Sequence, residues 1–228
     1  MSYGKLVSLG RQHGTDKATS HNYLRIYAKI FERYGTQKEI KFLEIGAGDI
    51  GASHKMWRDY FPEAQIFCFD PFHLPEQKET LQEELIQYGV KVFQGNQLVR
   101  EDLKMHGGDF DVIIDDAAHM PDAIQISLGH LFPFLKSGGL YIVEDLITAT
   151  SRQSRIEQVN NNIKNILDTM HVEDYILWEA FQELEKNKTW PSSTLSNEEK
   201  EYLVNNIQNY KFFDDNMGRN NLCVIRKK

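Results

Sequence analysis

Residues Lys41–Gly51 read KFLEIGAGDIG, a short apolar strand that runs directly into a G-x-G-x-x-G turn. Gly46 and Gly48 let the backbone turn tightly and let a ligand approach it closely. Asp70 ends the next apolar run, where its carboxylate can accept hydrogen bonds from ribose hydroxyls. A turn without a ligand can use the same residues, and nicotinamide enzymes share the pattern. The stretch therefore predicts a nucleoside site but does not identify the nucleoside.

Further apolar runs follow this first strand, and patterns with helical spacing lie between them. The next strands are expected at Ile66–Asp70, Lys91–Gln94, Asp111–Asp116 and Gly139–Glu144. Helices are expected over 21–35, from near Pro75 and from near Pro121, because proline is tolerated in the first helical turn. Alternating strands and helices are typical of parallel βαβ units, and strands that are apolar throughout are typical of sheets covered on both faces. The pattern predicts an α/β, Rossmann-like fold with helices on both faces of a mostly parallel sheet.

The C-terminal end departs from this alternation. Tyr210–Phe213 and Leu222–Arg226 look like strands, and the loop between them is too short for a crossover helix. This pair should therefore be antiparallel, and it completes a seven-stranded sheet. Within 146–209 the pattern indicates helices over Arg155–Met170 and Glu173–Lys186 and a capping box that opens a third helix, formed by Ser196 and Glu199.

Residues 1–228 are expected to form a single domain, since this length suits one hydrophobic core. Residues 1–20 are polar and look irregular. The segments 1–35 and 146–209 lie outside the alternating pattern, and we expect them to form a lid or a contact in a homo-oligomer.

Composition excludes several classes of partner. The net charge of −7 argues against a nucleic-acid partner, because affinity for phosphates comes from Lys and Arg. No apolar run approaches the roughly 20 residues that cross a bilayer, and Met1–Gly14 has no apolar signal core. The two cysteines, Cys68 and Cys223, lie in strand-like runs and are expected to be reduced packing residues. We expect a cytoplasmic protein that acts on a small molecule, with no membrane partner.

Carboxylates gather where the fourth and fifth strands end. Asp115 and Asp116 close one strand, Glu144 and Asp145 close the next, and His119 lies three residues beyond Asp116. Ligands of doubly wound sheets bind outside the carboxyl ends of the strands, so these side chains should converge beside the glycine turn. Four close negative charges repel one another unless a cation binds or some are protonated. Oxygen ligands favour Mg²⁺, with Mn²⁺ or Ca²⁺ next, although single acids could instead cap the following helices.

His119 has more than one interpretation. Its unperturbed pKa of about 6.5 suits a general base, which we favour. A capping or packing histidine and a metal ligand are the alternatives.

Several features resemble a known class of enzymes. Glu44 precedes Gly46 by two residues, which gives the E-x-G-x-G spacing of motif I in class I S-adenosylmethionine (SAM) methyltransferases. Glu44 could instead be a structural acid that bonds backbone amides, and in that family both roles can hold at once. The antiparallel final pair resembles their seven-stranded sheet, and a sulfonium cation suits acidic surroundings. Three segments resemble the metal-dependent sugar O-methyltransferases of macrolide biosynthesis, the mycinamicin and tylosin type. They are Gly14–Lys17 with His21 and Tyr23, Asp111–His119, and Gly138–Asp145.

The resemblance implies a role for each site residue. Asp116, Glu144 and Asp145 would bind Mg²⁺ or Mn²⁺, and His119 would act with Asp116 in catalysis, as the base. The cofactor would be contacted by the N-terminal segment, the glycine turn and the strand ends, through Thr15, Asp16, Lys17, Glu44, Gly46, Gly48, Asp70, Asn96, Gln97 and Asp115. The chain departs from the family at Asn96, where an aspartate is usual, and at Ala117-Ala118, where Gly-Ser is usual.

The function that fits these residues is a Mg²⁺-assisted transfer of a methyl group from SAM to a hydroxyl of a sugar or a glycosylated natural product. A non-sugar acceptor, such as a phosphorylated one, would satisfy the same metal site. A nicotinamide-dependent oxidoreductase would share the glycine turn and Asp70 but would not require the acidic cluster. A non-enzymatic nucleoside-binding protein would use the acids as helix caps.

Overall fold

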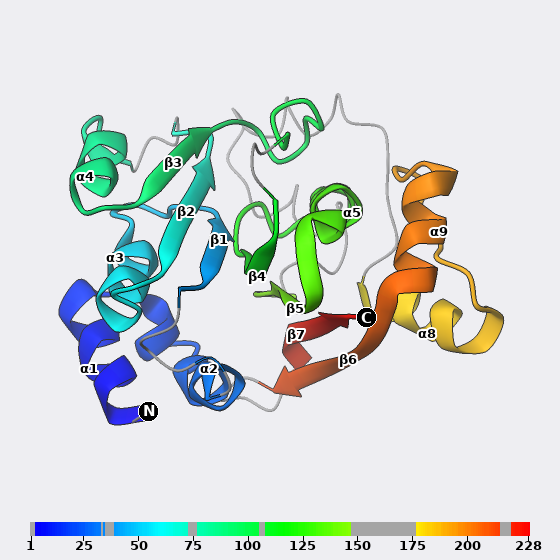
Figure 1. The fold of residues 1–228 in the computed structure, drawn as a ribbon, viewed down its shortest axis with the longest axis horizontal. Helices are drawn as coiled ribbons and strands as arrows, with labels where there is room; N and C mark the ends of the chain where they lie inside the picture. Colours follow the sequence, from blue (N-terminus) through cyan, green and yellow to red (C-terminus); the bar gives the residue numbers. More distant parts are fainter. Residues whose placement is uncertain are drawn as a thin grey trace.

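The computed structural model of the protein describes residues 3–32, 34, 39–72, 77–104, 108–146, 177–214 and 220–228. Its centre is a seven-stranded sheet in the order β3-β2-β1-β4-β5-β7-β6 (Figure 1). The strands are β1 (Lys41–Ile45), β2 (Gln65–Asp70), β3 (Lys91–Gln94), β4 (Phe110–Asp115), β5 (Leu135–Val143), β6 (Ile207–Asp214) and β7 (Asn220–Lys227). Neighbours from β3 to β5 pair in parallel, and β7 pairs antiparallel with both β5 and β6. The predicted α/β fold and antiparallel final pair are confirmed.

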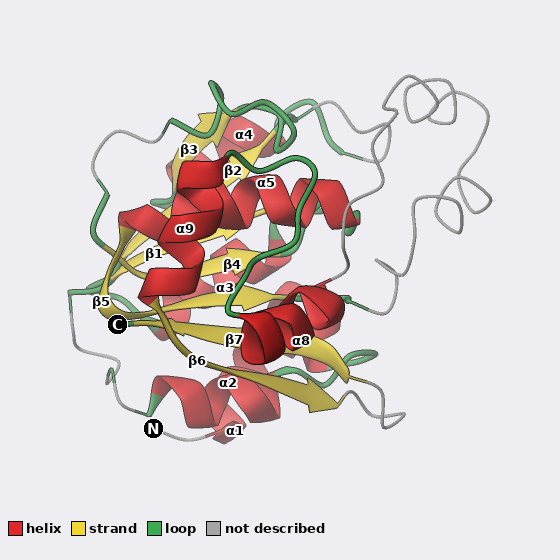
Figure 2. Cartoon of the chain, turned by 90° about the vertical axis from the view of Figure 1, so that its right-hand side faces the viewer, coloured by secondary structure: helices red, strands yellow, loops and turns green. Residues whose placement is uncertain are grey.

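Helices cover both faces of the sheet (Figures 1 and 2). One face carries α1 (Tyr3–His13), α2 (Leu24–Phe31), α3 (Ala52–Tyr60) and α4 (Leu81–Gln87), and the other carries α5 (Pro121–Leu131), α8 (Leu177–Asn187) and α9 (Asn197–Asn206). Successive side chains of a strand point to opposite faces, so each strand serves two cores. In β1, Phe42 packs on the α1–α4 side, whereas Leu43 and Ile45 pack on the α5 side. This double burial explains why the strands are apolar at nearly every position.

The N-terminal segment is regular, so the expectation of an irregular stretch over 1–20 is wrong. Helix α1 occupies most of it, and a 3-10 turn, η1 (Asp16–Ala18), follows. Gly10 lets the two pack closely, because a Cβ at Gly10 would lie 2.7 Å from the Cβ of Ala18. The contact fixes η1 against α1 and so fixes the start of the cofactor-covering segment that the sequence predicts.

Helix α5 begins at Pro121, and Ser196 and Glu199 form the capping box of α9, both as predicted. Pro75 lies outside the described residues, and the helix expected near it is described as α4, from Leu81.

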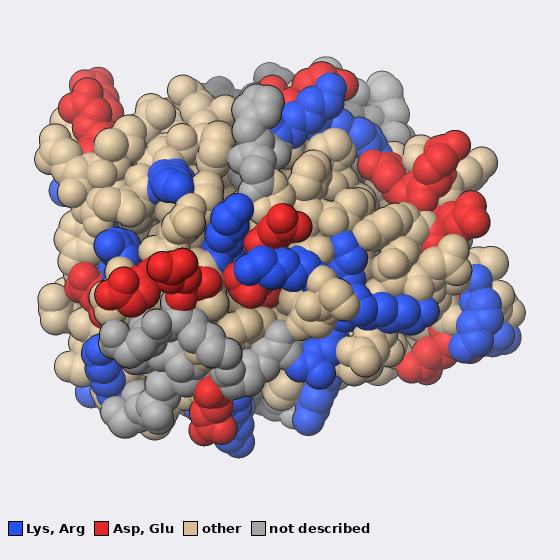
Figure 3. All heavy atoms as spheres, viewed as in Figure 1, with Lys and Arg blue, Asp and Glu red and all other residues tan. Residues whose placement is uncertain are grey.

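The insertion 146–209 is described in part. The helix expected over Arg155–Met170 lies outside the described residues, whereas α8 covers most of the helix expected over Glu173–Lys186. Cys68 and Cys223 are buried and free, as expected. Within the described ranges, no helix combines the length and the apolar character that a membrane span requires. On the face drawn in Figure 3, acidic and basic side chains lie among one another.

Candidate active site

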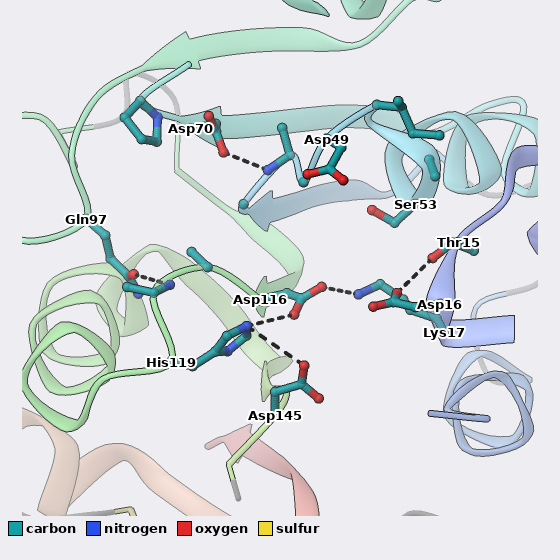
Figure 4. Close-up of a pocket in the computed structure, with 18 of the residues that line it drawn as sticks. Thr15, Asp16, Lys17, Asp49, Ser53, Asp70, Gln97, Asp116, His119 and Asp145 are labelled. Atoms are coloured by element: carbon teal, nitrogen blue, oxygen red, sulfur yellow. Dashed lines mark hydrogen bonds and ion pairs between the residues drawn. The ribbon is translucent and has the colours of Figure 1, made fainter. Parts of the chain in front are cut away.

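A cavity of about 570 Å³ opens at the carboxyl ends of the parallel strands (Figure 4). Segments far apart in the chain line it: the turn that joins α1 to η1, the glycine turn after β1, and the residues that follow β2, β3, β4 and β5. The lining includes Thr15, Asp16, Lys17, Gly46, Gly48, Asp70, Asn96, Gln97, Asp116, His119 and Asp145. The cavity therefore lies at the edge of the sheet where the sequence predicts a ligand.

The glycine turn follows the conformation that its sequence requires. Gly46 has φ 98°, and a Cβ there would lie 2.1 Å from the carbonyl oxygen of Asp116. Only glycine lets the turn pass this close to the start of the β4–α5 loop. Gly48 has φ 56°, and no heavy atom of the described residues lies within 4 Å of the place its Cβ would take, so this part of the backbone leaves room for a ligand. Thus Gly46 joins the turn to the acidic site, and Gly48 leaves room at the cavity.

Asp70 connects this turn to β2. One carboxylate oxygen accepts a hydrogen bond from the backbone N–H of Ala47 at 2.8 Å, and the other accepts from that of Phe72 at 2.6 Å and from the Gln77 amide at 3.0 Å. The carboxylate is 97% buried but still lines the cavity. It therefore orients the glycine turn and also faces the cavity.

Asp115 and Gln97 form a buried pair behind the cavity. The Gln97 amide nitrogen donates to both Asp115 oxygens at 2.8 and 3.0 Å, and Ser127 and Tyr141 also donate to Asp115. The Gln97 carbonyl accepts from the backbone N–H of Ala118 at 3.2 Å. Asp115 does not line the cavity, so the structure gives it and the Gln97 amide a part in holding the loop that carries His119.

Asn96 lies at the cavity next to this pair. Its side-chain oxygen accepts from the backbone N–H of Leu98 at 2.9 Å, and its own N–H donates to Asp102 at 2.8 Å. The amide thus shapes the turn after β3 as well as lining the cavity.

Glu44 and Glu144 point into the protein and do not line the cavity. Glu44 accepts from the indole N–H of Trp57 at 2.8 Å, and Glu144 accepts from the hydroxyl of Tyr27. Both also face the same cation, since the ammonium of Lys17 lies 2.8 Å from Glu144 and 3.3 Å from Glu44. The structure therefore does not bring Glu144 together with Asp145 at the cavity, although the two are consecutive.

Lys17 is the cation of this acidic region, a role that sequence reasoning missed. Its side chain is 1% exposed, and its ammonium also contacts Asp116, the contact drawn in Figure 4. Burial opposes the charge, but the three surrounding carboxylates outweigh burial and hold the pKa of Lys17 well above its usual value. The ammonium is thus directed at carboxylates, while the rest of the residue lines the cavity where the resemblance places the cofactor.

Asp116, His119 and Asp145 form the polar rim of the cavity. His119 Nε2 lies 3.7 Å from Asp116 Oδ1 and 3.8 Å from Asp145 Oδ2 (Figure 4). One ligand atom from each residue lies within 4.8 Å of the others, a grouping that suits one metal ion. The oxygens fit a hard cation such as Mg²⁺ or Mn²⁺, and the imidazole would suit Mn²⁺ better than Mg²⁺. His119 and Asp145 both have positive φ, 52° and 54°, the kind of backbone strain that clusters at functional sites.

A polar shell around Asp145 also escaped sequence reasoning. The Tyr23 hydroxyl donates to Asp145 at 2.6 Å, and the Asn221 amide donates to that hydroxyl at 2.6 Å. His21 Nδ1 lies 3.4 Å from Asp145, and its other nitrogen lies 3.5 Å from Asp16. The hydrogen bond with His21 lowers the pKa of Asp16 to about 2. His21 and Tyr23 belong to the first segment of the family resemblance, which was the available clue.

Comparisons with known proteins show what the chain is similar to. No model of a known protein family matches the sequence. The chain is 33% identical over 192 residues to the 8-demethyl-8-(2-methoxy-alpha-L-rhamnosyl)-tetracenomycin-C 3'-O-methyltransferase of Streptomyces olivaceus, covering 75% of this chain and 46% of that protein. It is 32% identical over 141 residues to the mycinamicin VI 2''-O-methyltransferase of Micromonospora griseorubida, covering 57% and 32%. The chain spans a third to about half the length of these relatives.

The fold also matches a solved structure. MycE methyltransferase from the mycinamycin biosynthetic pathway, in complex with Mg, SAH and mycinamycin VI, aligns with a TM-score of 0.69 and 22% identity. The match covers 98% of this chain and 54% of that chain. The chain therefore has the class I methyltransferase fold, and its predicted resemblance to the macrolide sugar O-methyltransferases is confirmed.

Proposed function

We propose that this chain transfers the methyl group of SAM to a hydroxyl of a sugar carried by a natural product, with the help of a divalent ion, Mg²⁺ or Mn²⁺. The observation that carries the proposal is the position of the Asp116–His119–Asp145 rim on the same cavity as the glycine turn. Two of the relatives reported above are named as methyltransferases that act on a rhamnosyl-tetracenomycin and on mycinamicin VI. A cytoplasmic location and homo-oligomer formation remain predictions from the sequence.

The glycine turn and Asp70 would hold the nucleoside part of SAM. Gly48 leaves the backbone open, and Asp70 lines the cavity with a carboxylate that can accept from ribose hydroxyls. Thr15 and Asp16 line the same cavity from the N-terminal segment, so they would close over the cofactor. Asn96, whose oxygen can accept a second hydrogen bond, would face the adenine.

Asp116 and Asp145 would hold the divalent ion, with either Glu144 or His119 as a third ligand. A bound ion supplies Lewis acidity that lowers the pKa of a coordinated hydroxyl. Glu144 is the third ligand that the resemblance implies, and it would have to share its carboxylate with Lys17. His119 is the third ligand that the distances favour, but a metal-bound imidazole could not accept a proton.

With Glu144 as the third ligand, His119 would act as the general base in the reaction. The acceptor oxygen would form a bond to the methyl carbon while the bond from that carbon to sulfur breaks, which leaves S-adenosylhomocysteine. The hydroxyl proton would pass to His119, whose imidazole Asp116 and Asp145 orient from within 4 Å. Positioning of the two reactants in one cavity would supply much of the remaining rate.

The test is a methyl-transfer assay with isotopically labelled SAM. The acceptors would be a rhamnosylated polyketide, its aglycone and a sugar phosphate, each assayed with and without EDTA. We expect label on the rhamnosylated compound and loss of transfer when EDTA is added. Transfer to the sugar phosphate alone would replace the proposed acceptor class. Calorimetric binding of NAD in place of SAM would overturn the proposal in favour of an oxidoreductase.

A further inference from the structure

Three carboxylates, those of Glu44, Asp116 and Glu144, lie around one point near the strand tips, and their charges must be compensated before any ligand binds. Glu44 and Glu144 are at most 1% exposed, and Asp116 lies beside them. A buried carboxylate without a partner is costly, and several in one place repel one another. When no divalent ion is present, the group therefore needs either a cation at its centre or a proton on one of the carboxylates; burial already raises the pKa of Glu144.

Lys17 supplies this cation from the chain itself. Its ammonium contacts Asp116, Glu144 and Glu44, which follow or belong to three different strands. Among the described residues, no donor forms a hydrogen bond to Glu44 Oε1, and the ammonium of Lys17 forms an ion pair with this oxygen at 3.3 Å. The two oxygens of Asp116 have different neighbours: Oδ2 contacts the ammonium of Lys17, and Oδ1 faces His119.

We propose that Lys17 is a positioning residue. Its ammonium takes the place of a divalent ion between Asp116 and Glu144, and it holds Asp116 so that one oxygen of this carboxylate faces the rim. The idea that Lys17 replaces a divalent ion rests on the proposed function. The idea that Lys17 is the counterion of the three carboxylates rests only on the contacts described above. Lys17 belongs to η1, and η1 packs against α1 at Gly10. The contacts of Lys17 therefore connect the N-terminal segment to the acidic site.

Lys17→Met tests this role. Methionine can follow the lysine chain as far as the ε-carbon, so it removes the ammonium and leaves its position empty. Removal of one partner from a buried ion pair is strongly destabilising, so in EDTA we expect the melting temperature to fall by about 6 °C or more. Saturating Mn²⁺ should restore most of that loss, and it should raise the melting temperature of this variant more than that of the wild type. A lysine with a merely structural packing role would not produce this extra response to the ion.

Two further variants make the result decisive. Lys17→Met combined with Glu144→Gln removes one positive and one negative charge, so we expect it to melt well above the single Lys17→Met variant in EDTA. Lys55→Met is the matched control, because Lys55 pairs with Glu84 at 3.4 Å and both side chains are partly exposed, and it should shift the melting temperature by about 2 °C or less.

The proposal is overturned if Lys17→Met melts within about 2 °C of the wild type in EDTA, or if Mn²⁺ raises the melting temperature of both by the same amount. It is also overturned if the double variant is no more stable than the single variant, including the case in which neither folds. The EDTA comparison needs no SAM and no acceptor, so a failure of methyl transfer would not affect it.

Discussion

Asp115 and Asp116 are consecutive residues at the tip of β4, yet their side chains differ in burial and in access to the cavity. Asp115 is buried among donors from Gln97, Ser127 and Tyr141 and does not reach the cavity. Asp116 is 21% exposed at its side chain and lines the cavity beside His119. Glu144 and Asp145 repeat the contrast one strand further along, with the first residue inside and the second at the rim.

The difference separates carboxylates that hold the fold in place from carboxylates that can bind a ligand at the cavity. In these two pairs, the acid whose oxygens accept hydrogen bonds from buried donors holds the strand tips and loops in place. An acid at the rim keeps an oxygen for a ligand. The two kinds should therefore respond differently to the same isosteric substitution, and three variants examine that difference.

Asp116→Asn should have the largest effect. It keeps the volume of the side chain but removes a negative ligand of the proposed ion and the orienting partner of His119. Since Lewis-acid stabilisation is worth several kcal/mol, we expect methyl transfer to fall about a thousandfold. Labelled-SAM turnover measures the loss. Calorimetry should show that SAM still binds, and turnover near the wild-type rate would remove Asp116 from the catalytic rim.

His119→Gln should have the second largest effect. Glutamine is polar and can lie beside the rim carboxylates but cannot take a proton, so turnover should fall about a hundredfold. The affinity for Mn²⁺, followed by calorimetry, decides between the two roles of this residue. An affinity close to that of the wild type would identify a base, whereas a large loss of affinity would show that His119 is a ligand instead.

Asp115→Asn should have the smallest effect on activity and a clear effect on stability. The new amide would present a donor to Ser127, Tyr141 and Gln97, which already donate, so one or more hydrogen bonds would be lost. We expect unfolding to become easier by about 2 kcal/mol, a fall in melting temperature of roughly 4 to 8 °C. Thermal denaturation measures this, with turnover per folded molecule as the control. A thousandfold loss of turnover without loss of stability would erase the distinction between the two acids.

Much of this arrangement could be predicted from the sequence because it depends on local patterns. The apolar runs gave the strands and the glycine spacing gave the turn. The rule that ligands bind at the carboxyl ends of strands predicted that four carboxylates and His119 would converge, and Asp116, His119 and Asp145 do lie together, whereas Asp115 and Glu144 do not reach the cavity. The capping box of α9 followed from two residues, Ser196 and Glu199.

The elements that sequence reasoning missed depend on distant contacts. Helix α1 contains Gly4 and Gly10, which have low helix propensity, and its packing against α3 and η1 outweighs that preference. Lys17 lies in a polar stretch where a lysine is normally solvated, and its burial depends on acids from β1, β4 and β5 that are remote in sequence. Nothing at position 144 itself indicates that its carboxylate turns inward while that of Asp145 turns outward.

The most direct measurement of the central claim is the binding of Mn²⁺ to the wild type, Asp145→Asn and Asp115→Asn, followed by electron paramagnetic resonance in the presence of S-adenosylhomocysteine. Asp145 is the cleaner rim position for this purpose, because Asp116 also contacts Lys17. We expect one ion per chain in the wild type, a loss of affinity of tenfold or more in Asp145→Asn, and unchanged affinity in Asp115→Asn. Equal affinity in all three proteins, or a loss confined to Asp115→Asn, would contradict the claim that the rim carboxylates hold the ion.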